Sequence, residues 1–242
     1  MKRLPQYDYL YLGDTKRVPY GSRSQETIHE FVAEALGYLF DKDCQIVILA
    51  CNTASAEALR KSQQEYLPVH FPERRVLGVL IPTAEIAASH SRVGVIATQS
   101  TVESGAWERE LTRQNPEMTV VQRAAPLLVP LIENDGVKYL EPILADYLGG
   151  FQSKPVEALI LGCTHYCVVK EQIRAMVGVP VLSQDEIVPD KLADYLARHP
   201  EIEVKLGRSG DRRYQVTDLT PAYESFAATM FGEPMDLERV SL

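Results

Sequence analysis

The stretch Ile46-Val47-Ile48-Leu49-Ala50-Cys51-Asn52-Thr53 is an apolar run that ends abruptly in small polar residues. Three other stretches share this design, and their apolar parts lie at 9–12, 93–97 and 159–162. A strand that is apolar on both faces must be buried on both faces, which is typical of parallel sheets. The four stretches therefore predict strands of a parallel sheet.

The segments between these runs carry helical patterns. Apolar residues recur at helical spacing over 28–39, after capping-box spacing at 22–25. A second helix is predicted to start at the capping-box spacing of 100–103, and a third covers 140–148. Alternating strands and helices predict an α/β fold, in which ligands bind at the carboxyl ends of the strands.

The second half of the chain repeats the pattern of the first. One strand ends in Cys51 and another ends in Cys163, at positions that look equivalent. We therefore predict two pseudo-symmetric lobes, each with a parallel sheet flanked by helices, and an active site in the cleft between them. Proline-rich connections predict a first lobe of 1–80 plus 190–242 and a second lobe of 81–189.

Composition excludes several classes of protein. The 242 residues are 45% hydrophobic and 24% charged, which is ordinary globular composition, and the net charge of -8 disfavours nucleic acid as a partner. No apolar run reaches the ~18 residues of a membrane-spanning helix, and no apolar stretch follows the basic start of the chain. We expect a cytoplasmic protein with no membrane partner, whose four cysteines are free thiols.

Cys51 and Cys163 are the residues most suited to chemistry. Each is predicted to lie where a strand gives way to a helix, and backbone N–H groups at a helix start favour the thiolate. A single cysteine in such a place is more often a small, inert apolar residue. Two cysteines at matching strand ends favour a functional role.

The segment around Cys163 also allows a metal site. Zinc could be held by Cys51, Cys163, His165 and Cys167, although structural zinc sites are usually built from paired ligand motifs. A site of four thiolates is excluded, because Cys44 and Cys51 would lie at opposite ends of one strand. We expect no metal, and we expect His165 to polarise the nearby thiol or to bind a carboxylate.

Five segments match one known family in its order along the chain. They are Tyr-Leu-Gly-Asp-Thr-Lys-Arg-Val-Pro-Tyr-Gly at 11–21, Ala-Cys-Asn-Thr-Ala-Ser-Ala at 50–56, Gly-Val-Ile-Ala-Thr at 94–98, Pro-Leu-Leu-Val-Pro-Leu-Ile-Glu at 126–133 and Leu-Gly-Cys-Thr-His-Tyr at 161–166. With them the chain resembles the glutamate racemases, of the cofactor-independent aspartate/glutamate racemase superfamily. The two cysteine motifs are the most specific part of this resemblance.

The resemblance implies an isomerase that needs no cofactor and supplies D-glutamate for peptidoglycan, and so for cell wall biogenesis and cell shape. Cys51 and Cys163 would act as base and acid on opposite faces of glutamate, with His165 as a helper. Glutamate is the small-molecule substrate that it implies, with a homodimer as one option. The substrate-binding residues that it implies are Tyr20, Gly21, Asn52, Thr53, Thr164 and His165, with Thr98, Thr101 and Glu133 as neighbours.

One feature departs from the family pattern. Family members begin with a strand that bears an Asp-Ser-Gly motif, followed by a turn and a helix, roughly 25 residues in all. This chain begins where that helix should be ending. We expect either a natural start upstream of Met1 or a shortened paralogue that is inactive and acts as a binding protein. A related racemase or isomerase that acts on aspartate, a hydantoin or maleate is a further alternative.

Overall fold

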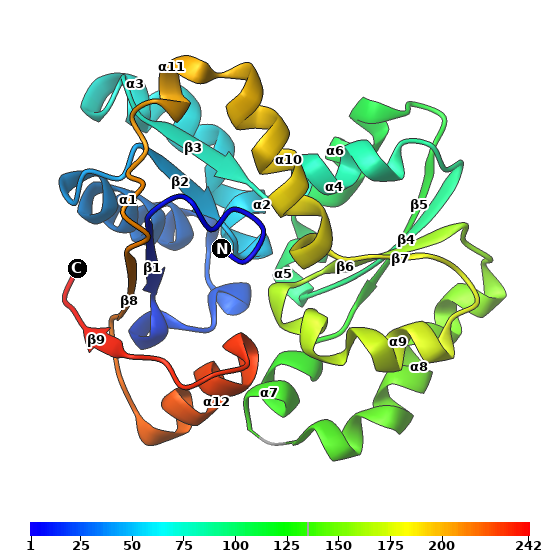
Figure 1. Cartoon of the computed structure of the whole chain (residues 1–242). Helices are drawn as coiled ribbons and strands as arrows, with labels where there is room; N and C mark the ends of the chain where they lie inside the picture. Colours follow the sequence, from blue (N-terminus) through cyan, green and yellow to red (C-terminus); the bar gives the residue numbers. More distant parts are fainter. Residues whose placement is uncertain (135) are drawn as a thin grey trace. The chain divides into compact units, whose positions relative to one another are not determined.

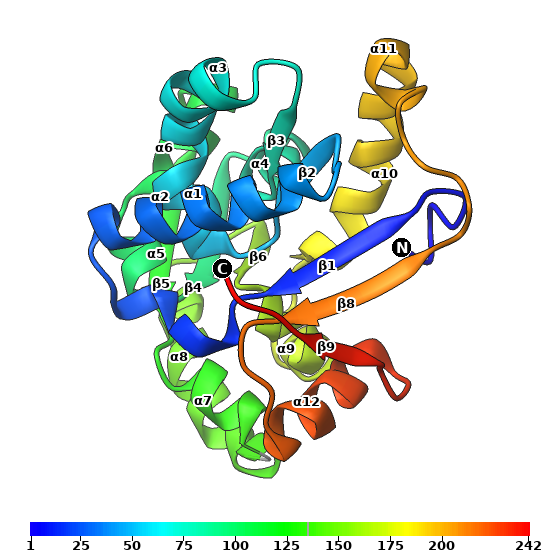
Figure 2. The ribbon, with the colours of Figure 1, turned by 90° about the vertical axis from the view of Figure 1, so that its left-hand side faces the viewer.

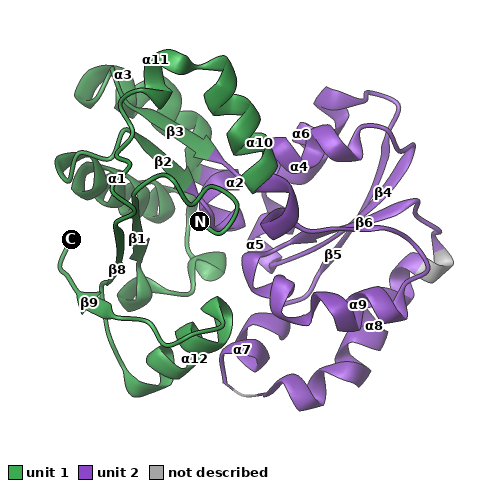
Figure 3. Ribbon diagram, viewed as in Figure 1, with its two compact units in different colours: residues 1–48, 58–77, 189–242 green, residues 49–57, 78–188 purple. Residues whose placement is uncertain are grey.

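The computed structural model describes residues 1–134 and 136–242, without the side chains of 152 and 153. It divides into two compact units, which Figure 3 colours separately. Unit 1 comprises residues 1–48, 58–77 and 189–242, and unit 2 comprises residues 49–57 and 78–188. The lobe boundaries expected from the sequence stay a prediction. The compact units group residues 49–57, which include Cys51, with unit 2.

Unit 2 is built on a four-stranded sheet in the order β5-β4-β6-β7, in which all neighbours are parallel. Its strands are β4 (Arg92–Ala97), β5 (Thr119–Ala124), β6 (Ala158–Gly162) and β7 (Val181–Leu182). Helices cover both faces of this sheet (Figure 1). They are α4 (Leu80–Ala87) and α6 (Ala106–Gln114) on one face, and α8 (Leu140–Ser153) and α9 (Lys170–Met176) on the other. The predicted α/β fold with parallel sheets is confirmed.

The two central strands of unit 2 form its core. Every residue of β6 is buried, and so is every residue of β4 after Arg92. At the end of β6 the packing is so close that a Cβ on Gly162 would lie 2.8 Å from Nε1 of Trp107 and 2.9 Å from the Cβ of Ala97. Glycine is therefore required immediately before Cys163, and this contact fixes the backbone from which that cysteine extends.

The strands of unit 1 belong to two separate small sheets. Strand β1 (Tyr9–Gly13) is parallel to β8 (Arg212–Val216), which is parallel to β9 (Leu237–Arg239), and Figure 2 shows β1 and β8 side by side. Strand β2 (Ile46–Leu49) pairs with β3 (Arg75–Gly78). In the described part of the chain, no strand joins these two sheets.

The expectation of strands buried on both faces is wrong for β1 and β2. Most of their residues are only half-buried. Among the described residues, β1 and β2 each pair with a strand on one side only, whereas β4 and β6 are internal strands, so the same apolar pattern gives less burial at β1 and β2.

The remaining elements connect and cover these sheets. The α-helices are α1 (Gln25–Asp41), α2 (Asn52–Lys61), α3 (Leu67–His70), α5 (Gln99–Glu103), α7 (Leu128–Glu133), α10 (Gln184–Arg198), α11 (Pro200–Glu203) and α12 (Pro221–Phe231). Short 3-10 segments are η1 (Thr15–Arg17), η2 (Tyr20–Ser22), η4 (Gly136–Tyr139) and η5 (Thr164–Val169), and η3 (Ser62–Tyr66) is a π-helix. Among the described residues, no helix has the length and apolar character that a membrane span requires.

Two helix starts differ from the predicted ones. Helix α1 is capped by Ser24, whose hydroxyl accepts a hydrogen bond from the N–H of Thr27 at 3.3 Å, because Ser22 ends a separate 3-10 segment. The second predicted helix starts earlier, with Thr98 as its cap, and Gly105 with a φ of 62° divides it into α5 and α6. The third predicted helix is confirmed as α8.

Candidate active site

Cys51 lies between the end of β2 and the first residue of α2, as the sequence predicts. Its carbonyl accepts the N–H of Ser55 at 2.9 Å, so Cys51 caps the helix through its backbone. The residue keeps an exposed surface, yet desolvation by the surrounding protein raises the pKa of its thiol. The N–H groups of Thr53 and Ala54 and the Thr53 hydroxyl oppose this rise, because each stabilises the thiolate.

Three threonine hydroxyls form a cluster next to Cys51. The hydroxyl oxygen of Thr53 lies 3.1 Å from that of Thr101 and 3.3 Å from that of Thr98. Thr98 in turn donates to Thr101 at 2.9 Å. Thr53 and Thr101 are almost fully buried. The cluster beside Cys51 is therefore polar and uncharged, and it connects the start of α2 to the start of α5.

Cys163 follows β6, and its environment is different. The residue is 8% exposed, and desolvation raises the pKa of its thiol to about 12, although the backbone N–H of His165 stabilises the thiolate. Negative charge on Cys51 raises this pKa further. A thiolate at Cys51 therefore favours the neutral thiol at Cys163.

A histidine and a carboxylate support Cys163. Nδ1 of His165 lies 3.9 Å from the sulfur, and Nε2 lies 3.0 Å from Oε1 of Glu133. An ionised carboxylate can only accept, so Nε2 donates to Glu133, and in the tautomer with its hydrogen on Nε2 the ring presents the lone pair of Nδ1 to the sulfur. The pair can accept a proton from the Cys163 thiol and share the charge with Glu133.

The chain after Cys163 is a 3-10 segment rather than the α-helix expected from the sequence. Segment η5 contains Thr164 and His165, and it is anchored by the buried Tyr166, whose hydroxyl donates to the carbonyl of Ala125 at 3.1 Å. Over residues 1–134 and 136–242, no three His, Cys, Asp or Glu side chains are grouped to hold a metal ion.

Asn52, the first residue of α2, forms a reciprocal amide pair with Gln184. Nδ2 of Asn52 donates to Oε1 of Gln184 at 2.7 Å, and Nε2 of Gln184 donates to Oδ1 of Asn52 at 2.8 Å. Sequence reasoning missed Gln184. The residue belongs to no motif, and only its position just after a short apolar strand hints that it lies at a strand end.

Tyr20 and Gly21 belong to unit 1, unlike the other predicted site residues. The Tyr20 hydroxyl donates to the carboxylate of Asp14, which also accepts from Nε of Arg17 at 2.7 Å and from the hydroxyl of Thr217 at 2.9 Å. Asp14 thereby ties the loop to the end of β8. Its role was missed because Thr217 is far away in the sequence.

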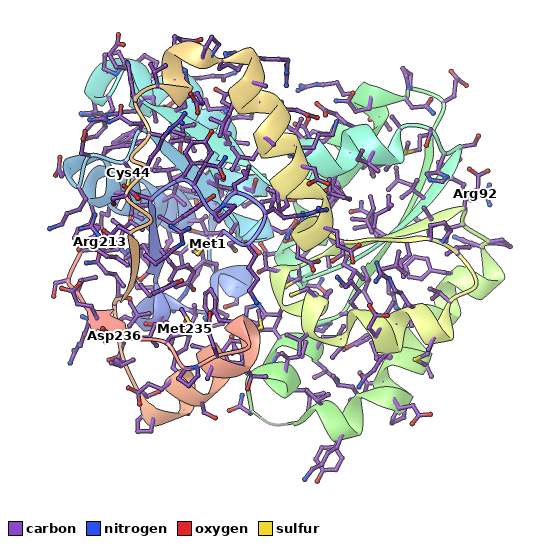
Figure 4. The ribbon with its side chains drawn as sticks, viewed as in Figure 1. Met1, Cys44, Arg92, Arg213, Met235 and Asp236 are labelled. Atoms are coloured by element: carbon purple, nitrogen blue, oxygen red, sulfur yellow. The ribbon has the colours of Figure 1, made fainter. Side chains whose placement is uncertain are left out.

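The other two cysteines have different surroundings. Cys44 lies in unit 1, ahead of β2 (Figure 4), and the charges of Arg213 and Arg74 act on it. Cys167 is half-buried in η5, and Asp185 and desolvation raise the pKa of its thiol. Neither has a hydrogen-bonding histidine among the described residues.

The site therefore has two cysteines, each at the end of a strand and both in unit 2. Hydroxyl groups support one cysteine, and a His–Glu pair supports the other. A model of the Asp/Glu/Hydantoin racemase family matches residues 1–187. The chain belongs to this family. Its similarity to full-length relatives places it among the glutamate racemases of that family.

Those relatives match over nearly the whole chain. The glutamate racemase of Persephonella marina is 34% identical, over 100% of this chain and 90% of its own length, and that of Aquifex aeolicus is 38% identical, over 96% and 87%. The solved structure of glutamate racemase from Francisella tularensis, in complex with D-glutamate, has a TM-score of 0.89 and 31% identity, and covers 100% of this chain and 90% of that one. The agreement in fold and in sequence therefore extends over both units.

Proposed function

We propose that this chain interconverts L- and D-glutamate without a cofactor, with Cys51 and Cys163 as the two groups that exchange the α-proton, and that it supplies D-glutamate for peptidoglycan. The observation that carries the proposal is the pair of strand-end thiols in unit 2, in which negative charge on Cys51 disfavours ionisation of Cys163. Such a pair suits a reaction that needs one thiolate and one thiol at the same time.

The reaction breaks the α-C–H bond of glutamate and forms an S–H bond on the cysteine that acts as base. The planar intermediate then takes a proton from the other cysteine on its opposite face, and that cysteine is left as the thiolate. His165 and Glu133 support proton transfer at Cys163, and the Thr53 hydroxyl with the N–H groups of α2 supports it at Cys51.

Desolvation raises the pKa of both thiols, so the thiolate needs help from the substrate. The ammonium group of glutamate is a cation close to the reacting carbon, and an adjacent cation favours an ionised thiol. We assign the binding of the amino acid to Asn52, Thr53, Thr164 and His165 of unit 2, and Tyr20 and Gly21 stay predicted binding residues. Thr98 and Thr101 act through Thr53.

The test is turnover of each glutamate enantiomer in heavy water, with no added metal or pyridoxal phosphate. We expect both enantiomers to be converted, with solvent deuterium on the α-carbon of the product. Because enantiomers have equal free energy, kcat/KM must be the same in both directions. Aspartate serves as the comparison substrate. Failure to exchange the α-proton of glutamate, or a requirement for pyridoxal phosphate, would contradict the proposal.

We further propose that the protein is cytoplasmic and has no nucleic-acid or membrane partner. A homodimer is the oligomeric state that we propose to test. Sedimentation of the purified chain at several concentrations checks the oligomeric state.

A further inference from the structure

The amide pair of Asn52 and Gln184 is buried next to one of the two thiols. Asn52 follows Cys51 directly, and Gln184 is the first residue of α10. Asn52 is 3% exposed and Gln184 is 6% exposed, and their amides are joined by two hydrogen bonds of 2.7 and 2.8 Å. The first residues of two helices are thus joined through their side chains.

A backbone carbonyl determines which way round both amides lie. Nε2 of Gln184 makes a second hydrogen bond, at 3.3 Å, to the carbonyl of Val79. A carbonyl can only accept, so the nitrogen of Gln184 must face it. The same nitrogen then faces Oδ1 of Asn52, and the oxygen of Gln184 faces Nδ2. Turning either amide over would place two acceptors or two donors against each other.

This arrangement leaves Asn52 with defined hydrogen-bonding capacity. An amide has two N–H donors and two acceptor positions, and the pair uses one of each. In the described part of the chain, one N–H and one lone pair of Asn52 remain, in a fixed orientation, at the residue adjacent to Cys51. A carboxylate of glutamate can accept that N–H, and its ammonium can donate to that lone pair.

We propose that Gln184 is a positioning residue for the racemisation of glutamate: it holds the amide of Asn52 so that the remaining N–H is presented to the bound amino acid. The inference rests on the proposed function and deepens it. Gln184 itself does not touch the substrate. Because Gln184 already holds Asn52 in place, no free energy is needed to order the Asn52 side chain when the substrate binds.

Two substitutions of nearly the same shape test this role. Gln184→Met removes both donors and the acceptor. Gln184→Glu keeps the acceptor but places a carboxylate oxygen against the carbonyl of Val79 and against Oδ1 of Asn52, which favours the reversed amide. The matched control is Gln63→Met, because Nε2 of Gln63 donates to a backbone carbonyl, that of Val76, at 2.8 Å, and Gln63 belongs to unit 1.

We expect KM for both enantiomers to rise roughly tenfold in Gln184→Met and further in Gln184→Glu, the factor that follows from losing one oriented hydrogen bond. We expect kcat to change less than threefold, and both constants of Gln63→Met to stay within twofold. Thermal melting of all three variants shows whether a loss of stability alone accounts for the effect, since Gln63→Met loses a comparable bond.

If the wild type is active and KM is unchanged in both Gln184 variants, the positioning role of Gln184 is overturned, whereas the proposed function stands. A loss of kcat with unchanged KM would overturn that role as well, because that pattern indicates disturbed chemistry rather than a misplaced binding group. A wild-type chain that does not racemise glutamate would overturn the proposed function, and the inference with it.

Discussion

The two strand ends that carry Cys51 and Cys163 stabilise a thiolate with different chemical groups. At Cys51 the groups that stabilise the thiolate are neutral donors, the Thr53 hydroxyl and the N–H groups at the start of α2. At Cys163 the sulfur faces a histidine that is backed by a carboxylate. The donors described at Cys51 can stabilise a thiolate, whereas the partner of Cys163 can also take the proton onto its imidazole ring.

This difference follows from the local fold. Strand β2 leads into an α-helix of ten residues, so N–H groups converge near Cys51. Strand β6 leads into the 3-10 segment η5, which places His165 two residues beyond the cysteine and within reach of Glu133 on α7. Equivalent positions in a sequence pattern therefore do not imply equivalent electrostatics.

Removing either thiol should have the largest effect. Cys51→Ala and Cys163→Ala should each abolish racemisation, because one face of the substrate then has no proton donor or acceptor. In heavy water, each variant should still exchange the α-proton of a single enantiomer, and the two variants should retain opposite ones. Mass spectrometry of each recovered enantiomer measures this.

Cys44→Ala and Cys167→Ala are the controls for the thiol pair, and both should stay within a few-fold of the wild type. Complete loss of activity in a folded Cys167→Ala variant would mean that the second cysteine motif has been assigned to the wrong residue. Exchange of the same enantiomer by both active-site variants would contradict the idea of one thiol on each face.

The His–Glu pair should rank second. His165→Asn is expected to lower kcat/KM by ~10²–10⁴-fold, equally in both directions, because the proton of Cys163 loses its acceptor. Glu133→Gln should cost about tenfold, because it removes the group that orients the ring and balances its charge. Initial rates with both enantiomers check this.

The control is His199→Asn, since Nδ1 of His199 lies 3.1 Å from Glu201 in an exposed pair in unit 1. Its kinetics should match those of the wild type. A His165→Asn enzyme with unchanged kcat/KM would show that Cys163 relies on neutral donors, as Cys51 does, and the contrast between the two ends would disappear.

The smallest effect should appear in stability at alkaline pH. The pKa of Cys163 is raised from 9.0 to about 12 by desolvation, so the unfolded chain releases this proton at lower pH than the folded chain does. Stability is therefore fully present below pH 9 and is lost as the pH rises towards 12. The loss should reach at most ~1.4 kcal/mol per pH unit.

Urea unfolding at pH 8 to 10.5 measures this linkage, with Cys163→Ser as the reference because serine does not titrate there. The free energy of unfolding of the wild type should fall relative to that of Cys163→Ser above pH 9. Parallel curves for the two proteins would mean that the thiol ionises in the folded state as readily as in the unfolded one.

The sequence predicted the buried strands of this molecule better than its more exposed strands. Four strands were predicted from apolar runs, and β4 and β6 are the most buried of them. The edge strand β5 was missed because its sequence, Thr-Val-Val-Gln-Arg-Ala, mixes polar and apolar residues on a half-exposed strand. Strand β3, with the sequence Arg-Val-Leu-Gly, was missed because only two of its four residues are large and apolar, whereas all four residues of β2 are.

For the site, sequence motifs identified residues but not their partners. Cys51, Cys163 and His165 were identified because their types and positions are unusual. Gln184 and Asp14 were missed because their roles depend on partners that only the fold brings close, such as Asn52, 132 positions away from Gln184. A hydrogen-bond partner leaves no periodic trace in a single sequence.

The parallel pairing of β1 with β8 has a consequence for how the protein is made. Tyr9 pairs with Arg212, roughly 200 positions further along the chain, so β1 leaves the ribosome long before its neighbour exists. All of unit 2 is synthesised in that interval. An unpaired strand edge is a template for pairing with other chains. A shortened chain that lacks β8 would therefore leave β1 unpaired. We expect such a chain to aggregate through β1 during synthesis.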